Sequence, residues 1–302
     1  MREWILLAVV MAARPIVAGE PAPGQSNAAN VTPAPLVHTY RTQGWLIHQT
    51  SNFRVCAHDI EADYTELAKR CETLRTRLQT TWFGEAPKSS WSPRCDVIVH
   101  ATLLDYQRAS GPGVGQSVGF ATLKIDGERV ASRRIDIRLD ADNWSGDALP
   151  HELSHVVLAD RFLGKRIPHW ANEGMSVLAE STTKQSTRIA ALQRSLARGL
   201  SYETADLFQL TTFPRPGYHD AFYGQSALAV RSLVERGTPT QFLSFIEVAL
   251  DAGYGHALHK VYKIQSVDKL EWLRREDFAD LAPIWELSQP DLRTKLAVSE
   301  NQ

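Results

Sequence analysis

The segment His151-Glu152-Leu153-Ser154-His155 has the pattern H-E-x-x-H. On a helix, two histidines at positions i and i+4 lie one above the other on the same face. Both imidazole rings can then bind one metal ion, with Glu152 beside them. Roughly 0.02 such matches are expected by chance in a chain of this composition. The alternative is an ordinary helix with two surface or capped histidines, and a third protein ligand would decide for zinc.

Two residues further along the chain are candidates for the third ligand. The segment Pro168-His169-Trp170-Ala171-Asn172-Glu173-Gly174-Met175 is expected to begin the next helix after a short turn. A reversal and an antiparallel return would bring Glu173, eighteen positions after His155, back over the histidine pair. Two histidines and a carboxylate leave one tetrahedral position for water, the arrangement of a catalytic zinc site. His169, one helical turn before Glu173, is the alternative ligand.

Three segments together resemble the gluzincin metallopeptidases, and most closely the peptidase MA-like families of exported bacterial proteins. They are H-E-L-S-H, then I-P-H-W-A-N-E-G-M, then A-F-Y-G-Q-S-A-L-A-V-R-S-L-V-E-R-G. The resemblance covers residues 40–275 and is strongest over 134–240. In those families a W-x-x-E-G element supplies the third zinc ligand, so the resemblance implies Glu173 rather than His169. It also implies one Zn²⁺ per chain and a peptide or protein substrate.

The implied mechanism uses zinc held by His151, His155 and Glu173. Zinc lowers the pKa of a bound water from 15.7 to about 7 and polarises the scissile carbonyl. Glu152 would act as the general base and pass the proton to the leaving amine.

Gluzincins commonly add a tyrosine or histidine that donates a hydrogen bond to the developing oxyanion. Tyr223 is the candidate here, and Tyr218 and His219 are the alternatives. An equally supported alternative for Tyr223 is a core aromatic residue before an amphipathic helix.

The chain departs from the family pattern at two points. Thermolysin-like enzymes have an aspartate four residues after the ligand glutamate, where this chain has Val177. Ser176, Glu180 and Asp160 are the candidates for fixing the histidine tautomers instead. The chain also lacks the G-x-M-E-N element of gluzincin aminopeptidases, which favours endopeptidase activity. Two alternatives remain: a non-catalytic, zinc-bound envelope binding or interaction module, and a hydrolase of a non-peptide amide.

The elements that must position these residues indicate an α+β fold. A small mixed β-sheet in the N-terminal half precedes a helical half, in a zincin-like arrangement with the H-E-x-x-H helix at the junction. Strands are expected at 45–48, 53–56, 96–100 and 133–140, and helices at 61–82, 148–161, 170–180, 187–198, 222–236, 239–252 and 266–275. The strict alternation over 133–140 predicts a half-exposed strand, either a solvated edge or one open to an added peptide strand.

The ends of the chain are expected to lie outside this fold. Residues 1–19 have the layout of a secretory signal peptide, with a short membrane-anchoring or buried helix as the alternative. A Pro/Ala-rich linker follows over 20–39. The catalytic domain then comprises an α/β part at 40–147 and a helical zinc-binding part at 148–275, with a tail at 276–302. We expect export to the periplasm or the extracellular space, without stable membrane insertion after signal cleavage.

Composition excludes several classes of protein. The 302 residues contain 33 Lys and Arg against 34 Asp and Glu, so nucleic acid is not an expected partner. No apolar run reaches the ~20 residues of a membrane span. Three cysteines permit one disulfide and leave one thiol over. Cys71 falls on the apolar face of the helix expected at 61–82, which favours a buried thiol there.

Overall fold

The computed structural model describes residues 4–6, 36–58 and 63–267. Within it the chain divides into two compact units. Unit 1 comprises residues up to 73, 89–124 and 131–144, and unit 2 comprises residues 74–88, 125–130 and those from 145 onward.

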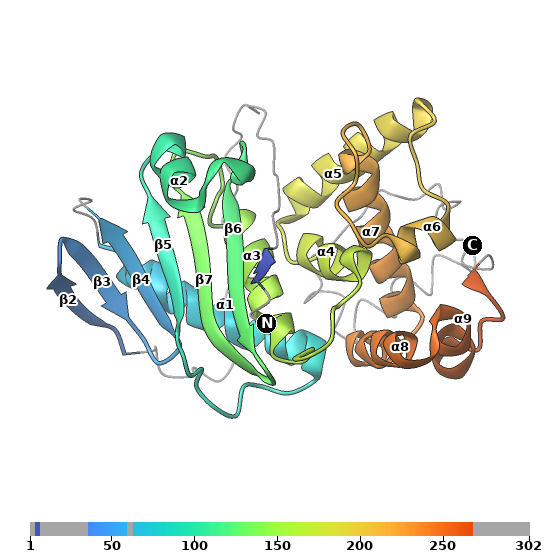
Figure 1. Cartoon of the computed structure of the whole chain (residues 1–302), viewed down its shortest axis with the longest axis horizontal. Helices are drawn as coiled ribbons and strands as arrows, with labels where there is room; N and C mark the ends of the chain where they lie inside the picture. The colour runs from blue at the N-terminus through green and yellow to red at the C-terminus, as the bar shows by residue number, and fades with distance from the viewer. Residues whose placement is uncertain (1–3, 7–35, 59–62, 268–302) are drawn as a thin grey trace, which may run out of the picture. The chain divides into compact units, whose positions relative to one another are not determined.

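The strands form one mixed sheet in the order β1-β6-β7-β5-β4-β3-β2 (Figure 1). Its central strand, β5, is parallel to both β4 and β7, whereas β2, β3 and β4 pair in antiparallel succession. The bounds are β1 Trp4–Leu6, β2 His38–Thr42, β3 Trp45–Gln49, β4 Phe53–His58, β5 Cys95–His100, β6 Gly119–Asp126 and β7 Arg129–Arg138. This sheet, followed by helices, confirms the predicted α+β fold.

Strand β7 corrects one prediction. It lies between β5 and β6, so it is not an edge, and the acid on its polar face is not solvated. Asp136 is buried and accepts hydrogen bonds from His100 at 2.8 Å and from Arg134 at 2.6 Å. The charged face of β7 therefore pairs within the protein, because buried charges are tolerated only when they are paired and hydrogen-bonded.

The helices predicted between residues 148 and 252 are all present; the one at 239–252 has the predicted bounds, and the others have shifted ends. Ser181 caps α5 by accepting a hydrogen bond from the Lys184 backbone N–H, so this helix begins earlier than the apolar pattern indicates. The helix predicted at 266–275 falls almost entirely outside the described residues. The bounds are α1 Thr65–Phe83, α2 Leu103–Ser110, α3 Ala148–Ala159, α4 His169–Val177, α5 Thr182–Ala197, α6 Thr204–Gln209, α7 His219–Glu235, α8 Pro239–Ala252 and α9 Tyr254–Ala257.

Two glycines bring the central helices of unit 2 into close contact. Helix α7 packs against both α4 and α5. A Cβ atom on Gly174 of α4 would lie 2.4 Å from the backbone oxygen of Ser226 on α7. A Cβ atom on Gly224 of α7 would lie 2.6 Å from the Cβ of Leu192 on α5. Since real Cβ atoms do not approach this closely, both crossings require glycine.

The predicted signal peptide, linker and tail are outside the described residues, apart from Trp4–Leu6 in β1 and the first residues of β2. These three assignments stay predictions. Among the described residues, no helix is long and apolar enough to cross a membrane. Cys56, Cys71 and Cys95 are buried thiols, and no disulfide joins them.

Candidate metal centre

Helix α3 carries His151, Glu152 and His155. Pro150 lies in its first turn, where the missing N–H costs nothing. Every residue from Ala148 to Leu158 is buried, so the two histidines are held inside the protein rather than on a solvated helix face. Their ring centroids are 5.0 Å apart. The four-residue spacing thus brings the two imidazoles to one point, as the sequence predicts.

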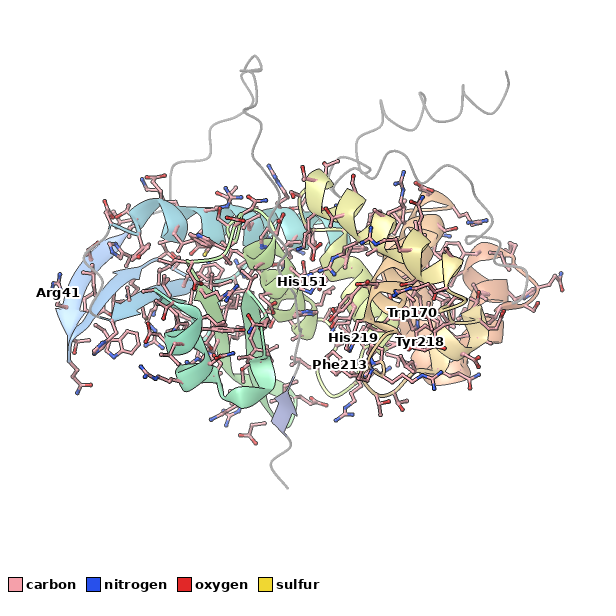
Figure 2. The ribbon with its side chains drawn as sticks, turned by 90° about the horizontal axis from the view of Figure 1, so that it is seen from above. Arg41, His151, Trp170, Phe213, Tyr218 and His219 are labelled. Atoms are coloured by element: carbon pink, nitrogen blue, oxygen red, sulfur yellow. The ribbon has the colours of Figure 1, made fainter. Side chains whose placement is uncertain are left out.

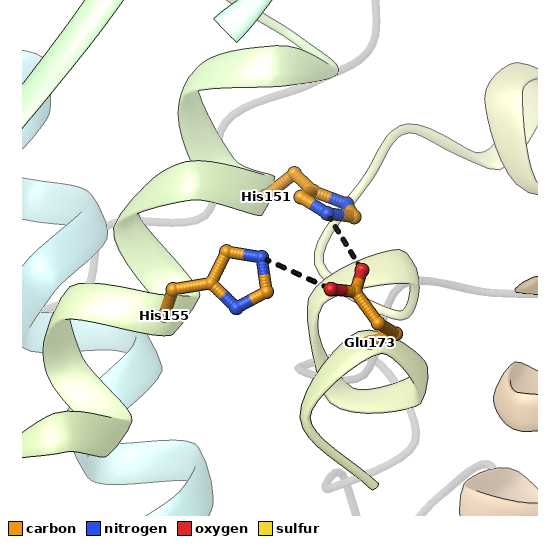
Figure 3. A group of neighbouring side chains, drawn as sticks. All are labelled: His151, His155 and Glu173. Atoms are coloured by element: carbon orange, nitrogen blue, oxygen red, sulfur yellow. Dashed lines mark ion pairs between the residues drawn. The ribbon is translucent and has the colours of Figure 1, made fainter. Parts of the chain in front are cut away.

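Helix α4 brings Glu173 to the same point. The side chain of Trp170, one turn earlier, is fully buried, stacks on Phe208 with centroids 4.0 Å apart, and donates to Tyr254 Oη at 3.1 Å. These contacts fix the start of α4. Glu173 Oε2 then lies 3.4 Å from His151 Nε2, and Glu173 Oε1 lies 3.9 Å from His155 Nε2 (Figure 3). One ligand atom from each of the three side chains lies within 4.8 Å of the others.

The three side chains fit a zinc ion. The Nε2 atoms of His151 and His155 and both carboxylate oxygens of Glu173 are buried and have no hydrogen-bond partner among the described residues. Leaving such groups unsatisfied costs free energy, on the order of 1–3 kcal/mol each. Zinc ligands at about 2.0–2.1 Å in a tetrahedron lie about 3.3 Å apart. The donor set and its spacing therefore suit Zn²⁺, which would satisfy these atoms.

The opposite ring nitrogens are fixed by protein oxygens. His151 Nδ1 lies 2.8 Å from Glu180 Oε1. His155 Nδ1 lies 3.1 Å from Asn172 Oδ1 and 3.2 Å from Ser176 Oγ. Each Nδ1–H can donate to these oxygens, which leaves the Nε2 lone pairs directed at Glu173 and available to a metal.

Glu180 is itself held by a largely buried arginine. Arg188 donates from Nε to Glu180 Oε2 at 2.6 Å and from Nη2 to Glu180 Oε1 at 2.5 Å. Burial alone would raise the pKa of Glu180, but the charge and hydrogen bonds of Arg188 lower it to about 2. The carboxylate next to His151 is therefore ionised at neutral pH, as a strong acceptor must be.

The two histidines differ in their electrostatic surroundings. Burial opposes protonation of His151, but Glu173 and Glu180 outweigh it and raise the pKa of His151. His155 faces an amide and a hydroxyl on its outer side, and burial lowers its pKa to about 4. His155 is therefore a neutral imidazole, the form that binds metal.

Glu152 and Tyr223 are next to the three candidate ligands. Glu152 is completely buried on α3, and its charge acts on both His151 and Tyr223. Tyr223 lies on α7 and its side chain is buried. Burial, then the charges of Glu173 and Glu152, raise its pKa well above 10. The phenol thus stays protonated and is able to donate a hydrogen bond.

The alternative residues have other surroundings. His169 begins α4 and its ring packs against Phe213, with centroids 5.8 Å apart, so it is not part of the ligand group. Tyr218 (labelled in Figure 2) precedes α7, with the guanidinium carbon of Arg215 4.4 Å from its ring centroid. His219 is the half-buried first residue of α7.

Of the three residues considered for fixing the histidine tautomers, two contact a histidine. Val177 is buried and apolar, so no carboxylate occupies the position four residues after Glu173. Glu180, seven residues after Glu173, lies against His151 instead, and Ser176 lies against His155. Asp160 is the residue that ends α3.

Sequence reasoning missed Asn172 and Arg188. Asn172 stands directly before Glu173, inside the W-x-x-E-G element. Its place next to the expected ligand was the one sequence signal that could have indicated a contact with His155. Arg188 stands eight positions after Glu180 on a separate helix, and no spacing rule connects it with the histidines.

Comparisons with known proteins give only distant similarity. No family model matches the chain, and no curated protein matches it by sequence. Among solved structures, the M1 zinc metallopeptidase from Deinococcus radiodurans has a TM-score of 0.39 and 13% identity, over 82% of this chain and 52% of that one. A glutamate-to-alanine mutant of that enzyme has a TM-score of 0.40 and 12% identity, with the same coverage.

The same mutant bound to a Tyr-Ser-Ala substrate has a TM-score of 0.34, 12% identity and coverage of 82% and 53%. The chain thus spans about half the length of the solved structures it matches. At these values the similarity does not establish a family, and the chemistry of the site carries the functional argument.

Proposed function

We propose that the chain is a zinc-dependent metallopeptidase of the gluzincin type, in which His151, His155 and Glu173 bind one Zn²⁺. The observation that carries the proposal is the convergence of buried nitrogen and oxygen atoms that no described protein group satisfies. Glu152 supports turnover rather than metal storage, because a buried acid beside the ligands that is not itself a ligand suits a general base.

Each side chain has a separate task in peptide hydrolysis. A zinc ion at this site would supply Lewis acidity to the scissile carbonyl and lower the pKa of water. Glu152 accepts a proton from the attacking water and delivers it to the leaving amine. The phenol of Tyr223 donates a hydrogen bond to the carbonyl oxygen as negative charge develops there. Glu180 and Asn172 hold the two imidazoles in their orientations.

Two finer parts of the proposal come from the sequence. The apolar segment within residues 1–19 supports export to the periplasm or the extracellular space. The absence of a G-x-M-E-N element supports cleavage within peptides rather than removal of their first residue.

The test is cleavage of a mixed peptide library by the chain, with Glu152→Gln as the matched variant. Both proteins are loaded with zinc, and bound zinc is measured by mass spectrometry of the metal. The variant keeps the size of the side chain and the three candidate ligands but removes the base. We expect one equivalent of zinc in each protein, products from the native chain only, and cleavage at internal bonds.

The other outcomes separate the alternatives. Zinc binding without cleavage by either protein would favour a binding module or a hydrolase of a non-peptide amide. Equal cleavage by both proteins would contradict the role of Glu152. A native chain that binds no zinc would contradict the proposal as a whole.

A further inference from the structure

Arg188 is a largely buried cation, with 12% of its side chain exposed, and it does not touch the candidate metal ligands. It contacts Glu180, the residue that holds His151. The Nε and Nη2 atoms of Arg188 each donate a hydrogen bond to a different oxygen of the Glu180 carboxylate. Such a two-point contact fixes the plane of the carboxylate, which a single point charge cannot do. Glu180 in turn meets His151 through Oε1.

The same guanidinium also lies against Tyr223. Its central carbon is 4.7 Å from the centre of the Tyr223 ring, within the distance of a cation–π contact. Tyr223 is buried and Arg188 is largely buried, so water screens this attraction only weakly. Arg188 on α5 therefore contacts an acid that follows α4 and an aromatic residue on α7.

Charge explains why a cation is needed here. Glu152 on α3, Glu173 on α4 and Glu180 directly after α4 are three buried acids close to His151. A divalent metal balances two negative charges, and Arg188 supplies the third positive charge. Without Arg188, the buried Glu180 carboxylate would lose the cation that contacts both of its oxygens, which is strongly unfavourable. The carboxylate would then turn away from His151 and no longer serve as its acceptor.

We infer that Arg188 is a positioning residue for the metal centre, holding Glu180 against His151 and the Tyr223 ring in its place on α7. The inference rests on the proposed zinc site. It goes beyond that site because it assigns to one residue, Arg188, the positioning of both Glu180 and Tyr223. Arg188 acts on zinc through Glu180 and on Tyr223 directly.

The first experiment measures the zinc dissociation constant of the purified full chain by competition with a chromogenic chelator. The variants are Arg188→Gln, Arg188→Lys, Glu180→Gln and the double variant Glu180→Gln/Arg188→Gln. Arg194→Gln, at an exposed arginine on the same helix, is the matched control. Circular dichroism checks that each protein is folded.

We expect Arg188→Gln to weaken zinc binding about tenfold or more, the usual cost of losing a group that orients a metal ligand. Arg188→Lys keeps the charge but not the two-point contact, so its loss should be smaller. The double variant should bind zinc no more weakly than Glu180→Gln alone, within about twofold, because Arg188 acts through Glu180. It also removes both buried charges together, so it tests the inference even if a single variant fails to fold.

Two results would overturn the inference while leaving the zinc site intact. One is a folded Arg188→Gln variant that binds zinc as tightly as the native chain. The other is a double variant whose loss equals the product of the two single losses. A native chain without zinc affinity would instead refute the proposed function, and this inference with it.

The second experiment tests the contact with Tyr223 without metal or substrate. Urea unfolding of the zinc-free chain is measured for Arg188→Gln, Tyr223→Leu and the double variant. We expect the effects to be non-additive by about fivefold in the unfolding equilibrium constant, as for a cation–π pair that is not fully desolvated. Additive effects would show that Arg188 does not hold Tyr223.

Discussion

Asn172 Oδ1 lies 3.1 Å from His155 Nδ1, although Asn172 is the residue immediately before Glu173. One turn of α4 therefore supplies both a candidate metal ligand and the group that orients another ligand. The two functions cannot be separated by moving the helix, because any shift of α4 displaces both side chains.

Replacing Asn172 by alanine should weaken zinc binding about tenfold, because the His155 ring loses an acceptor for Nδ1–H. Ser176 Oγ, at 3.2 Å, remains as a second acceptor, so the double variant with Ser176→Ala should lose more. Chelator competition measures both, with Gln193→Ala, exposed on α5, as the control. Unchanged affinity in the double variant would exclude these residues from orienting His155.

Replacing Gly174 by alanine should destabilise the fold by about 1–3 kcal/mol, since the added methyl group overlaps the Ser226 carbonyl oxygen. Gly255 is the matched control, because it is also helical and a Cβ there meets nothing within 4 Å. Alanine at Gly255 should be neutral or stabilising. Urea unfolding measures both changes, and equal effects at the two positions would contradict the close contact between α4 and α7.

Removing the metal should lower stability, because His151, His155 and Glu173 then keep buried atoms unsatisfied. Free zinc at a hundredfold excess over the dissociation constant should stabilise the chain by about 2.7 kcal/mol. Thermal unfolding after chelator treatment, with and without added zinc, measures the difference. A His155→Gln variant should show almost none of this stabilisation, and an equal shift in that variant would place zinc elsewhere.

Acid should weaken the sheet through Asp136. Burial alone would raise the pKa of Asp136, but hydrogen bonds from His100 and Arg134 outweigh it and hold the pKa below the ordinary 3.8. The ionised carboxylate therefore stabilises the fold fully above about pH 4, and this stabilisation is lost as the pH falls from there through the lower pKa of the folded state.

An Asp136→Asn variant should lack this part of the acid dependence. Urea midpoints between pH 3 and pH 6 should change less for it than for the native chain. The control is Asp126→Asn, at an exposed carboxylate, which should retain the native profile. Parallel profiles for Asp136→Asn and the native chain would contradict the stabilising role of the Asp136 carboxylate.

The cysteines should be unreactive in the folded chain. Burial raises the pKa of Cys56 and of Cys71 to about 12, and Cys95 is buried as well. Thiolates are the reactive form, so a thiol reagent at pH 8 should label none of the three until denaturant is added, and then all three. Fewer than three labelled thiols in denaturant would indicate a disulfide.

The parts of the site that could be predicted are those set by local geometry. His151 and His155 meet because a helix repeats every 3.6 residues, which holds in any fold. The prediction of Glu173 as the third ligand assumed that a second helix returns antiparallel to the first. The preference for Glu173 over His169 came from the family resemblance. Glu180 was one of three candidates, and only the turn after α4 brings it to His151.

The contacts that escaped prediction depend on packing between distant segments. Arg188 reaches Glu180 because α5 begins directly after its cap Ser181 and packs against α7, which no pattern in the sequence specifies. In β7 the alternation of Arg134 and Asp136 has the same appearance as a solvated face. Instead, Arg134 pairs with Asp136, and Asp136 also pairs with His100 of the neighbouring strand. The sequence pattern of this interior strand is therefore the same as that of an edge strand.

Gly174 and Gly224 directly follow Glu173 and Tyr223. At each helix crossing, a slip of one residue would therefore put a glutamate or tyrosine side chain where only a hydrogen atom fits. A chain with either slip could not close these crossings, and so the three candidate ligands would not meet beside the tyrosine. The one helix alignment that the glycines allow is therefore also the alignment that assembles the candidate metal centre.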